Sequence, residues 1–432
     1  MIRPPARPSM PSTSQLAIEH DGEHSLCLVV RGQRVVPGDD LSDRFGFDIA
    51  RLDERLLRIL VTLAVRRHGG GPGWMTAEEL GLLALNGASG SATAKLLEVS
   101  LRGSTRVGPQ LIEFRPAGAT GGGRSRGPYR LGVPAESTVL DEAACWCFLT
   151  GRVLAEGMAD GCSLADHLAQ ARAAMHAGRF IEAQALTQMA LRSMFEGVQE
   201  LRRATERDRC YWLAQTCLLL SNVELEIGAT RLGLLAVARA QRCFERIRHP
   251  EGSASALLVE ANLRGQIDDT QERRRSYVAA RNALVRLDDA GRGPRRGMQR
   301  AIYIGTLGQR MSLLGQTRQA ARRLRMAHQL CEAASSRTWA AIWEVRLGQN
   351  ALTAGDRPAA ERFMASALEA AEAMTPSGYA SLVRGMSELS LATGRLDEAE
   401  RWIVCARTVG EKLGMGHQVL LADRLMARLE RL

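Results

Sequence analysis

The feature that most constrains the fold of this chain is a short sequence motif, from a glycine to an alanine, that occurs four times. In each copy an alanine follows the glycine after five residues, and a second alanine follows seven residues later. Glycine tolerates a positive φ and ends a helix at low cost, and residues seven apart share one helical face. The motif therefore predicts a helix, a glycine turn and a second helix. The small side chains of the second helix allow a neighbouring helix to approach closely. The copies are Gly178 with Ala183 and Ala190, Gly315 with Ala320 and Ala327, Gly355 with Ala360 and Ala367, and Gly394 with Ala399 and Ala406.

The spacing of the copies indicates a stacked array. A unit of two helices cannot bury its apolar face alone, so several must stack to form a continuous core. The last three glycines, at 315, 355 and 394, are 40 and 39 residues apart, which is a helical-repeat period. Two weaker copies start at Gly228 and Gly265, where Gly233 and Thr270 replace the first alanine. The residues midway between the alanines are Thr187, Leu324, Met364 and Ile403.

These residues resemble the tetratricopeptide repeat (TPR) family in its longer form of roughly 40 residues. The resemblance covers about residues 166–432 and implies a superhelix whose groove binds a protein or a peptide. The other interpretation is an unrelated helical bundle rich in alanine. We expect the regular copies near the C-terminus to be structural, and a specific partner site in the irregular middle, from Gly228 to Gly305.

Length and composition indicate a soluble, mostly α-helical protein of two or three domains. The chain has 432 residues and a mean hydropathy of −0.14. No apolar run approaches the roughly 18–20 residues that a membrane span needs, and the N-terminus lacks the apolar core of a signal peptide. Nine cysteines without a CxxC pair indicate reduced thiols in a cytosol. We therefore expect a cytoplasmic protein without a membrane partner.

Positive charge is concentrated in one part of the N-terminal third. The formal net charge of the whole chain is +10, and Lys95 and Lys412 are its two lysines. Residues 55–135 contain eleven basic and four acidic residues, which gives this segment a charge of +7. A basic domain of this kind favours a nucleic-acid partner, since arginine makes paired contacts to phosphate and guanine.

The basic segment has a definite predicted order of elements. Residues 24–36 alternate as two short strands, and a helix capped by Asp53 follows. A second helix opens with the capping box Thr76-Ala77-Glu78-Glu79. A third helix covers about 91–102, with Ser91 or Thr93 as its cap. Residues 110–115 and 128–131 then predict an antiparallel hairpin around a glycine-rich loop.

That order resembles the winged helix-turn-helix of the OmpR/PhoB type over about residues 22–134. Two departures from the family pattern are Pro128, where a glycine is usual, and Leu101-Arg102-Gly103, where a longer basic run is usual. The resemblance implies that the third helix enters the major groove of duplex DNA, where each base pair shows a distinct pattern of donors and acceptors. The matching segments are Arg55 to Leu60, Met75 to Leu80, Ala94 to Arg102, and Arg126 to Leu131.

The resemblance also implies a set of DNA-binding residues. Thr93, Lys95 and Arg102 are expected to be exposed on the third helix and to reach base edges or phosphate. Arg124 and Arg126 are placed in a wing that enters the minor groove, with Arg130 at the end of the wing. Arg106 and Arg115 are expected to meet phosphate. For any one of these side chains the alternative is a solvated surface charge.

Motifs for catalysis are absent from the sequence. It contains no GxxxxGK[ST], no HExxH and no GxSxG, and its eight histidines are dispersed. We therefore expect no enzymatic activity, no cofactor and no metal ion.

Together these features predict four segments: a disordered tail over 1–20, a winged helix-turn-helix domain over 21–135, a helical connector over 136–165, and a TPR superhelix over 166–432. The fold class is thus mostly α with an N-terminal α+β domain. The function predicted first is a sequence-specific regulator of transcription, an activator in our interpretation, with double-stranded DNA, a protein or peptide partner and RNA polymerase as candidate partners. The alternative is a TPR adaptor whose winged domain contacts only protein. The target genes, the direction of regulation, the TPR ligand and a homodimeric state are left open.

Overall fold

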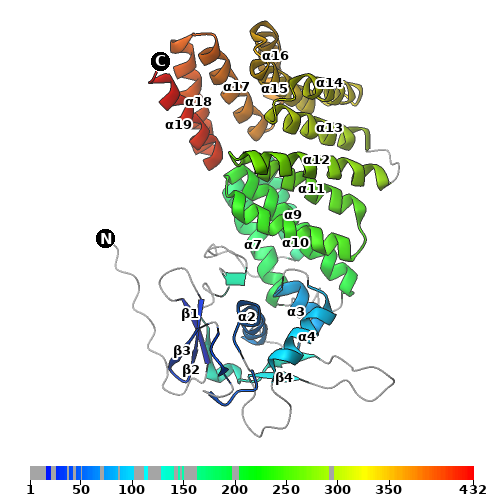
Figure 1. The fold of residues 1–432 in the computed structure, drawn as a ribbon, viewed down its shortest axis with the longest axis vertical. Coiled ribbons are helices and arrows are strands. Elements are labelled where there is room, and N and C mark those ends of the chain that lie inside the picture. The colour runs from blue at the N-terminus through cyan, green and yellow to red at the C-terminus, as the bar shows by residue number, and fades with distance from the viewer. Residues whose placement is uncertain are drawn as a thin grey trace. The chain divides into compact units, whose positions relative to one another are not determined.

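The computed structural model divides the chain into two compact units (Figure 1). The first comprises Met1–Asp160 with Leu191–Arg209, and the second comprises Gly161–Ala190 with Cys210–Leu432. The residues that the structure describes are 16–20, 26–36, 38–41, 45–49, 51–68, 73–85, 88–101, 111–114, 128–140, 145, 148–149, 163–196, 204–290 and 296–432.

The first unit contains a four-stranded sheet in the order β3-β2-β1-β6. The pairs β1–β2 and β2–β3 are antiparallel, whereas β1 and β6 run parallel. A two-residue turn at Arg31 and Gly32, both with positive φ, joins β2 to β3, as the alternation of residues 24–36 predicted. The strands are β1 (Leu16–His20), β2 (Leu26–Val30), β3 (Gln33–Val35) and β6 (Thr138–Leu140).

Two strands of this sheet lie where no strand was expected. The prediction of a disordered tail over 1–20 is wrong for residues 16–20, which form β1 at the centre of the sheet order. Leu16, Ala17 and Ile18 are buried, so this short segment buries enough apolar surface to be ordered. The helical connector over 136–165 is likewise wrong for residues 138–140, because they form β6 beside β1.

The described part of the first unit also contains three helices and a hairpin, in the predicted order. The side chain of Asp53 accepts a hydrogen bond from the backbone N–H of Leu56, and Thr76 forms the predicted capping box with Glu79. The third helix is capped by Ser89, and not by Ser91 or Thr93. The elements are α2 (Glu54–His68), α3 (Ala77–Leu83), α4 (Gly90–Ser100), the short 3₁₀ helix η1 (Ala135–Ser137), and the antiparallel strands β4 (Ile112–Phe114) and β5 (Tyr129–Leu131).

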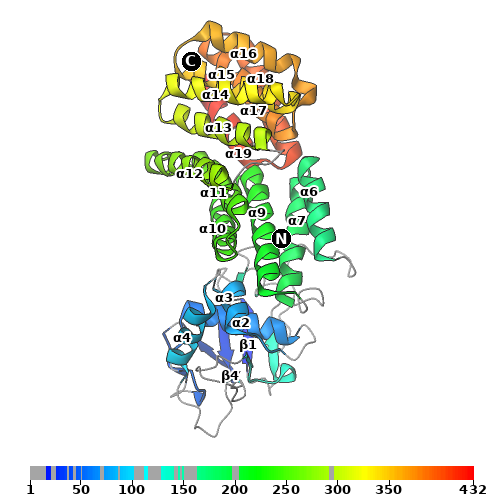
Figure 2. The ribbon, with the colours of Figure 1, turned by 90° about the vertical axis from the view of Figure 1, so that its right-hand side faces the viewer.

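The second unit is an array of consecutive helices joined by short turns (Figure 2). Its helices are α6 (Leu164–His176), α7 (Phe180–Glu196), α9 (Glu206–Ile227), α10 (Thr230–Arg246), α11 (Pro250–Gln266), α12 (Thr270–Asp289), α13 (Arg296–Leu313), α14 (Thr317–Ala333), α15 (Arg337–Thr353), α16 (Arg357–Glu369), the 3₁₀ turn η2 (Ala371–Ala373), α17 (Pro376–Ala392), α18 (Leu396–Leu413) and α19 (Gly416–Leu429). The end of α7, from Leu191, and the start of α9, up to Arg209, belong to the first unit.

The glycine-to-alanine motif has the predicted role in all four copies. Each glycine is the turn between two helices and has a positive φ, between 74° and 79°. Every alanine of the four pairs is buried, with at most 3% of its surface exposed. Gly228 is also a turn glycine, with a φ of 93°, but Gly265 lies within α11. The turn after α11 is formed instead by residues 267–269, where Asp269 caps α12.

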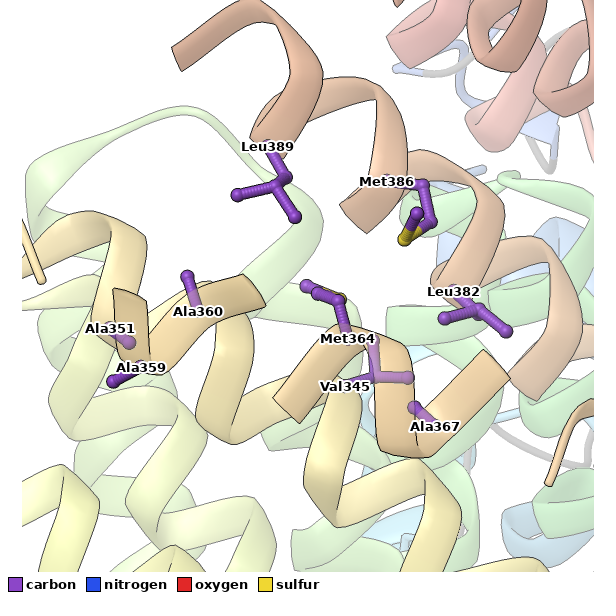
Figure 3. Packing of buried hydrophobic residues seen from close by; sticks show 9 residues of the cluster. All are labelled: Val345, Ala351, Ala359, Ala360, Met364, Ala367, Leu382, Met386 and Leu389. Atoms are coloured by element: carbon purple, nitrogen blue, oxygen red, sulfur yellow. The ribbon is translucent and has the colours of Figure 1, made fainter. Parts of the chain in front are cut away.

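The packing around the third copy of the motif, with Ala360 and Ala367, shows why the motif requires small residues. Ala360, Met364 and Ala367 of α16 face Leu382, Met386 and Leu389 of α17 (Figure 3). A methyl group built on Gly348 or Gly385 would lie within 3.0 Å of the Met364 side chain. Helices α15 and α17 can therefore both approach α16 closely, and the Met364 side chain fills the space between them.

The N-terminal and C-terminal parts of the array share a hydrophobic cluster, which we call the seam. Phe180, Ala380 and Met415 are its buried residues, and they come from α7, from α17 and from the turn before α19. Gly178 also lies here, because a methyl group on it would be 2.9 Å from the Pro376 ring. The helical array therefore closes on itself. The partly buried residues around the seam are Met175, Ile227, Val409 and Leu413.

Candidate ligand cavity

The closed array contains a cavity of about 560 Å³. Its walls come from α6, from the first helix of each later pair (α9, α11, α13, α15 and α17) and from α19, with Phe180 of α7 at one side. A volume of this size is within the roughly 300–1,000 Å³ of pockets that hold small ligands. The turn glycines and alanine faces build the array, and its inner helices provide the side chains of this site.

Three arginines from successive inner helices contribute to the cavity wall. They are Arg310 of α13, Arg346 of α15 and Arg384 of α17. Arginine presents its N–H donors in a rigid planar fork that matches a carboxylate or a phosphate. We refer to these three residues as the arginine cluster.

Arg310 is the most buried member of the arginine cluster, with 5% of its surface exposed. One terminal nitrogen donates to the side-chain oxygen of Gln309 at 2.7 Å and lies 3.4 Å from that of Asn262, whereas Nε has no hydrogen-bond partner. Its other terminal nitrogen lies against Gly265, where an added methyl group would be 1.4 Å away. The absence of a side chain at Gly265 is thus what leaves room for the guanidinium.

The other two members of the cluster are partly buried. Arg346 donates to the side-chain oxygens of Gln349 and Ser381, at 2.8 and 3.3 Å. The Nε atom of Arg384 lies 3.6 Å from a carboxylate oxygen of Glu388 but makes no hydrogen bond. Burial and the charges of Arg384 and Arg310 together lower the pKa of Arg346 to about 9, against the opposing effects of Glu388 and Glu226. Arg346 therefore keeps its charge at neutral pH, and the neighbouring charges of Arg310 and Arg384 repel it.

His417 of α19 also lies near positively charged side chains. Burial, together with the charges of Arg384 and Arg424, lowers the pKa of its imidazole to about 4. The ring is therefore neutral at physiological pH. A site with this potential favours an anionic ligand.

Glu226 of α9 is the acidic side chain that lines the same cavity. Burial raises the pKa of its carboxyl group to about 7, against the opposing effects of Arg346 and a hydrogen bond with Ser377. The carboxyl group is therefore only partly ionised at neutral pH and does not balance the arginine cluster.

Replacing Glu226 with glutamine is expected to stabilise the protein more at pH 8 than at pH 5. The folded-state pKa is above the usual value of 4.5, so the folded protein binds more protons than the unfolded chain between these values. The wild-type protein consequently loses stability as the pH rises through 7, and the variant lacks this loss. The expected difference between the two pH values is on the order of 1 kcal/mol or more. Urea unfolding of both proteins at both pH values measures it, and an equal effect at pH 5 and pH 8 would contradict the assignment. The titration of His417 is common to both proteins and cancels.

Another part of the lining is apolar and aromatic. Trp339 and Trp343 of α15 stack with ring centroids 5.7 Å apart, and both line the cavity with Ile302 and Ile342. Trp343 and Arg346 are one helical turn apart, so aromatic surface and positive charge are adjacent on α15. The cavity can thus hold a ligand with both an apolar and an anionic part.

The structure places the predicted DNA-binding residues in different environments. Lys95 is exposed on α4, as expected. The expected exposure of Thr93 is wrong, because its side chain is fully buried and its hydroxyl donates to the Ser89 carbonyl at 3.0 Å. Arg130 forms a 2.5 Å ion pair with Glu113 and lies over the Trp74 ring. Arg102, Arg106, Arg115, Arg124 and Arg126 lie outside the described residues.

The cavity residues were not identified from the sequence. The three arginines are 36 and 38 residues apart, close to the repeat period, and this recurrence was the available signal. The recurrence of these three arginines could not be recognised, because the chain contains 57 basic residues and nearly all of them are arginine. Asn262, Gly265 and Ile302 of the cavity lining belong to the irregular middle, where a partner site was expected. However, the regular C-terminal repeats also line the cavity.

Two further cavities lie elsewhere in the repeat unit, one of about 360 Å³ between α11 and α12 and one of about 850 Å³ between α14, α15 and α16. Within the described residues, no group of three or more histidine, cysteine, aspartate or glutamate side chains is arranged to hold a metal ion. Across the same part of the chain, no helix has both the length and the apolar character needed to cross a membrane.

The fold defines a mostly α-helical protein with a helical-repeat unit and a smaller N-terminal unit that contains the sheet. No family model and no curated protein matches the sequence. Among solved structures, the chain is similar to a Rap protein complexed with competence and sporulation factor, with 11% identity, a TM-score of 0.43, and coverage of 62% of this chain and 74% of that one.

Two further solved structures have comparable similarity. The apo form of RapI has 12% identity and a TM-score of 0.40, and the match covers 62% of this chain and 97% of that one. Aspartyl phosphate phosphatase F from Bacillus subtilis has 10% identity and a TM-score of 0.39, with coverage of 64% and 82%. Similarity at this level does not bear on the ligand or the activity of the present chain.

Proposed function

We propose that the repeat unit binds a short peptide segment of a partner protein, so that the chain acts as an adaptor. The observation that carries this proposal is the cavity of about 560 Å³ inside the closed array. Its size suits a few residues of extended chain and not a folded domain. Its lining combines aromatic surface with hydrogen-bonding side chains, which is the composition that recognises side chains and backbone together.

The experiment is selection of binders from a synthetic library of six-residue peptides by the full-length protein, followed by calorimetry on the retained peptides. A tryptophan at Gln309, which lines the cavity, is expected to weaken binding by at least about tenfold, since it fills the site. The matched control is Gln319→Trp on α14, because Gln319 is exposed and does not line the cavity. Retention of no peptide, or equal binding by both variants, would overturn the proposal.

A second candidate function is binding of duplex DNA by the first unit, which would make the chain a transcription regulator. The supporting observation is the element order of that unit, in which a sheet, the helices α2, α3 and α4, and the β4–β5 hairpin follow one another. This order resembles that of a winged helix-turn-helix, and in this proposal α4 is the helix that would enter the major groove. Lys95 is exposed on α4, and the segment 55–135 carries a charge of +7.

Lys95→Ala is expected to weaken DNA binding by the full-length protein and to reduce its salt dependence. Loss of one phosphate contact lowers the slope of log K against log salt concentration by about 0.9. Mobility shift on genomic fragments over a salt series measures both quantities. The control is Arg325→Ala, since Arg325 is exposed on α14 of the repeat unit. If the wild-type protein binds no duplex with sequence preference at moderate salt, this second candidate is wrong.

A further inference from the structure

The arginine cluster is positively charged beyond what its neighbours balance. The acidic groups that interact with its three arginines are Glu226 and Glu388, and the first of these is only partly ionised at neutral pH. The hydrogen-bond partners of Arg310 and Arg346 are uncharged amide and hydroxyl groups. Buried charges are normally paired, because their removal from water is costly. The free protein thus retains a buried site whose charge an anion would balance.

We propose that Arg310, Arg346 and Arg384 form a subsite for the carboxylate of the bound peptide. This inference rests on the proposed peptide-binding function and specifies the chemistry of the ligand. A carboxylate accepts two parallel hydrogen bonds from one guanidinium, and such charge-assisted pairs are the strongest hydrogen bonds in proteins. The group is the C-terminal carboxylate or the side chain of an aspartate or glutamate.

The geometry supports a built subsite. The Nε atoms of Arg310 and Arg384 are buried N–H donors without a hydrogen-bond partner, and Arg310 as a whole is 5% exposed. Gly265 holds open the space that the Arg310 guanidinium occupies. The three side chains come from three successive inner helices, so one anion between them would link three repeats. Such a ligand would therefore stabilise the array as well as occupy it.

The apolar wall specifies the neighbour of the carboxylate. Trp343 precedes Arg346 by one turn of α15, and Trp339 stacks on Trp343. An apolar or aromatic residue beside the carboxylate would cover these rings, whereas a second charge there would lose its hydration without a partner. The expected ligand is a short peptide with a carboxylate next to a bulky apolar side chain.

The test compares two synthetic six-residue peptide libraries on the full-length protein. One library has free C-termini and includes aspartate and glutamate, and the other has amidated C-termini with asparagine and glutamine in their place. The wild-type protein is expected to retain the first library and not the second. Amidated peptides with aspartate or glutamate then show whether the carboxylate is terminal or from a side chain.

Variants connect the retained peptides to the arginine cluster. Arg310→Gln is expected to weaken binding of carboxylate peptides about tenfold to a hundredfold, while Arg325→Gln on the exposed face of α14 leaves it unchanged. Gly265→Ala keeps all three arginines but displaces the Arg310 guanidinium, and it is expected to weaken binding as well. Circular dichroism and thermal unfolding identify a variant that has failed to fold.

Each outcome distinguishes the inference from the proposed function. Equal retention of both libraries, with binding still lost in Gln309→Trp, would overturn the carboxylate subsite and leave the peptide-binding function standing. Retention of neither library would overturn both. Unchanged carboxylate binding in folded Arg310→Gln and Gly265→Ala proteins would also overturn the subsite.

Discussion

Phe180→Ala is expected to lower the free energy of unfolding of the repeat unit by about 3–5 kcal/mol. Phe180 is 3% exposed and packs in the seam between the N-terminal and C-terminal parts of the array. Its removal leaves a cavity at the contact that closes the array, and the surrounding residues come from elements far apart in the chain. Urea unfolding followed by circular dichroism measures the change.

Loss of the seam is also expected to affect the ligand cavity, because Phe180 lines it. Hydrogen exchange should become faster in α6 and α17, and peptide affinity should fall even though every arginine remains. The control is Leu235→Ala on α10, where the side chain is 61% exposed and the expected change is below about 1 kcal/mol. An unchanged exchange rate on both sides of the seam would show that the array does not close in solution.

Met364→Ala is expected to cost about 2–5 kcal/mol. Met364 is fully buried within α16 and packs against Gly348 and Gly385 of the two flanking helices. Because the backbone of those helices is fixed by their other contacts, the space left by the side chain can only partly close. Denaturant unfolding monitored by tryptophan fluorescence measures the loss.

The effect of Met364→Ala is expected to be greatest in the C-terminal repeats. Each repeat contacts mainly its sequence neighbours, so a weakened interface promotes local unfolding on its C-terminal side. Met326→Ala on α14 is the matched control, since Met326 is 40% exposed. A similar loss of stability in both variants would contradict the assigned role of Met364 as the residue that fills the space between α15 and α17.

Several features of the fold were predicted correctly because they depend on interactions within a few residues. The capping box of Thr76 and Glu79 joins positions three apart, and the positive φ of Gly178 and Gly394 follows from the backbone of a tight turn. The alanine faces follow from helical periodicity alone. The order of the three helices and the hairpin in the first unit could be predicted for the same reason.

Errors arose where distant contacts decide the outcome. Thr93 is a polar residue near the start of a helix, and its sequence neighbours suggest exposure or capping, yet it is buried in the packed unit. Residues 16–20 follow a segment rich in proline and serine, but they pair with β2 and with β6, whose sequence position is more than 100 residues away. Gly265 resembles a turn glycine, but it is a helix residue that makes room for Arg310.

By itself, the sequence determined that this protein contains a stack of helical pairs, because local turn and periodicity rules specify each pair. Only the tertiary structure decided that the array closes through Phe180, Ala380 and Met415. That closure also brings arginines 36 and 38 residues apart to one cavity, next to a glutamate and a histidine from the opposite ends of the array. Burial and charge at such a site depend on many contacts between residues far apart in the chain. Local sequence patterns therefore do not determine them.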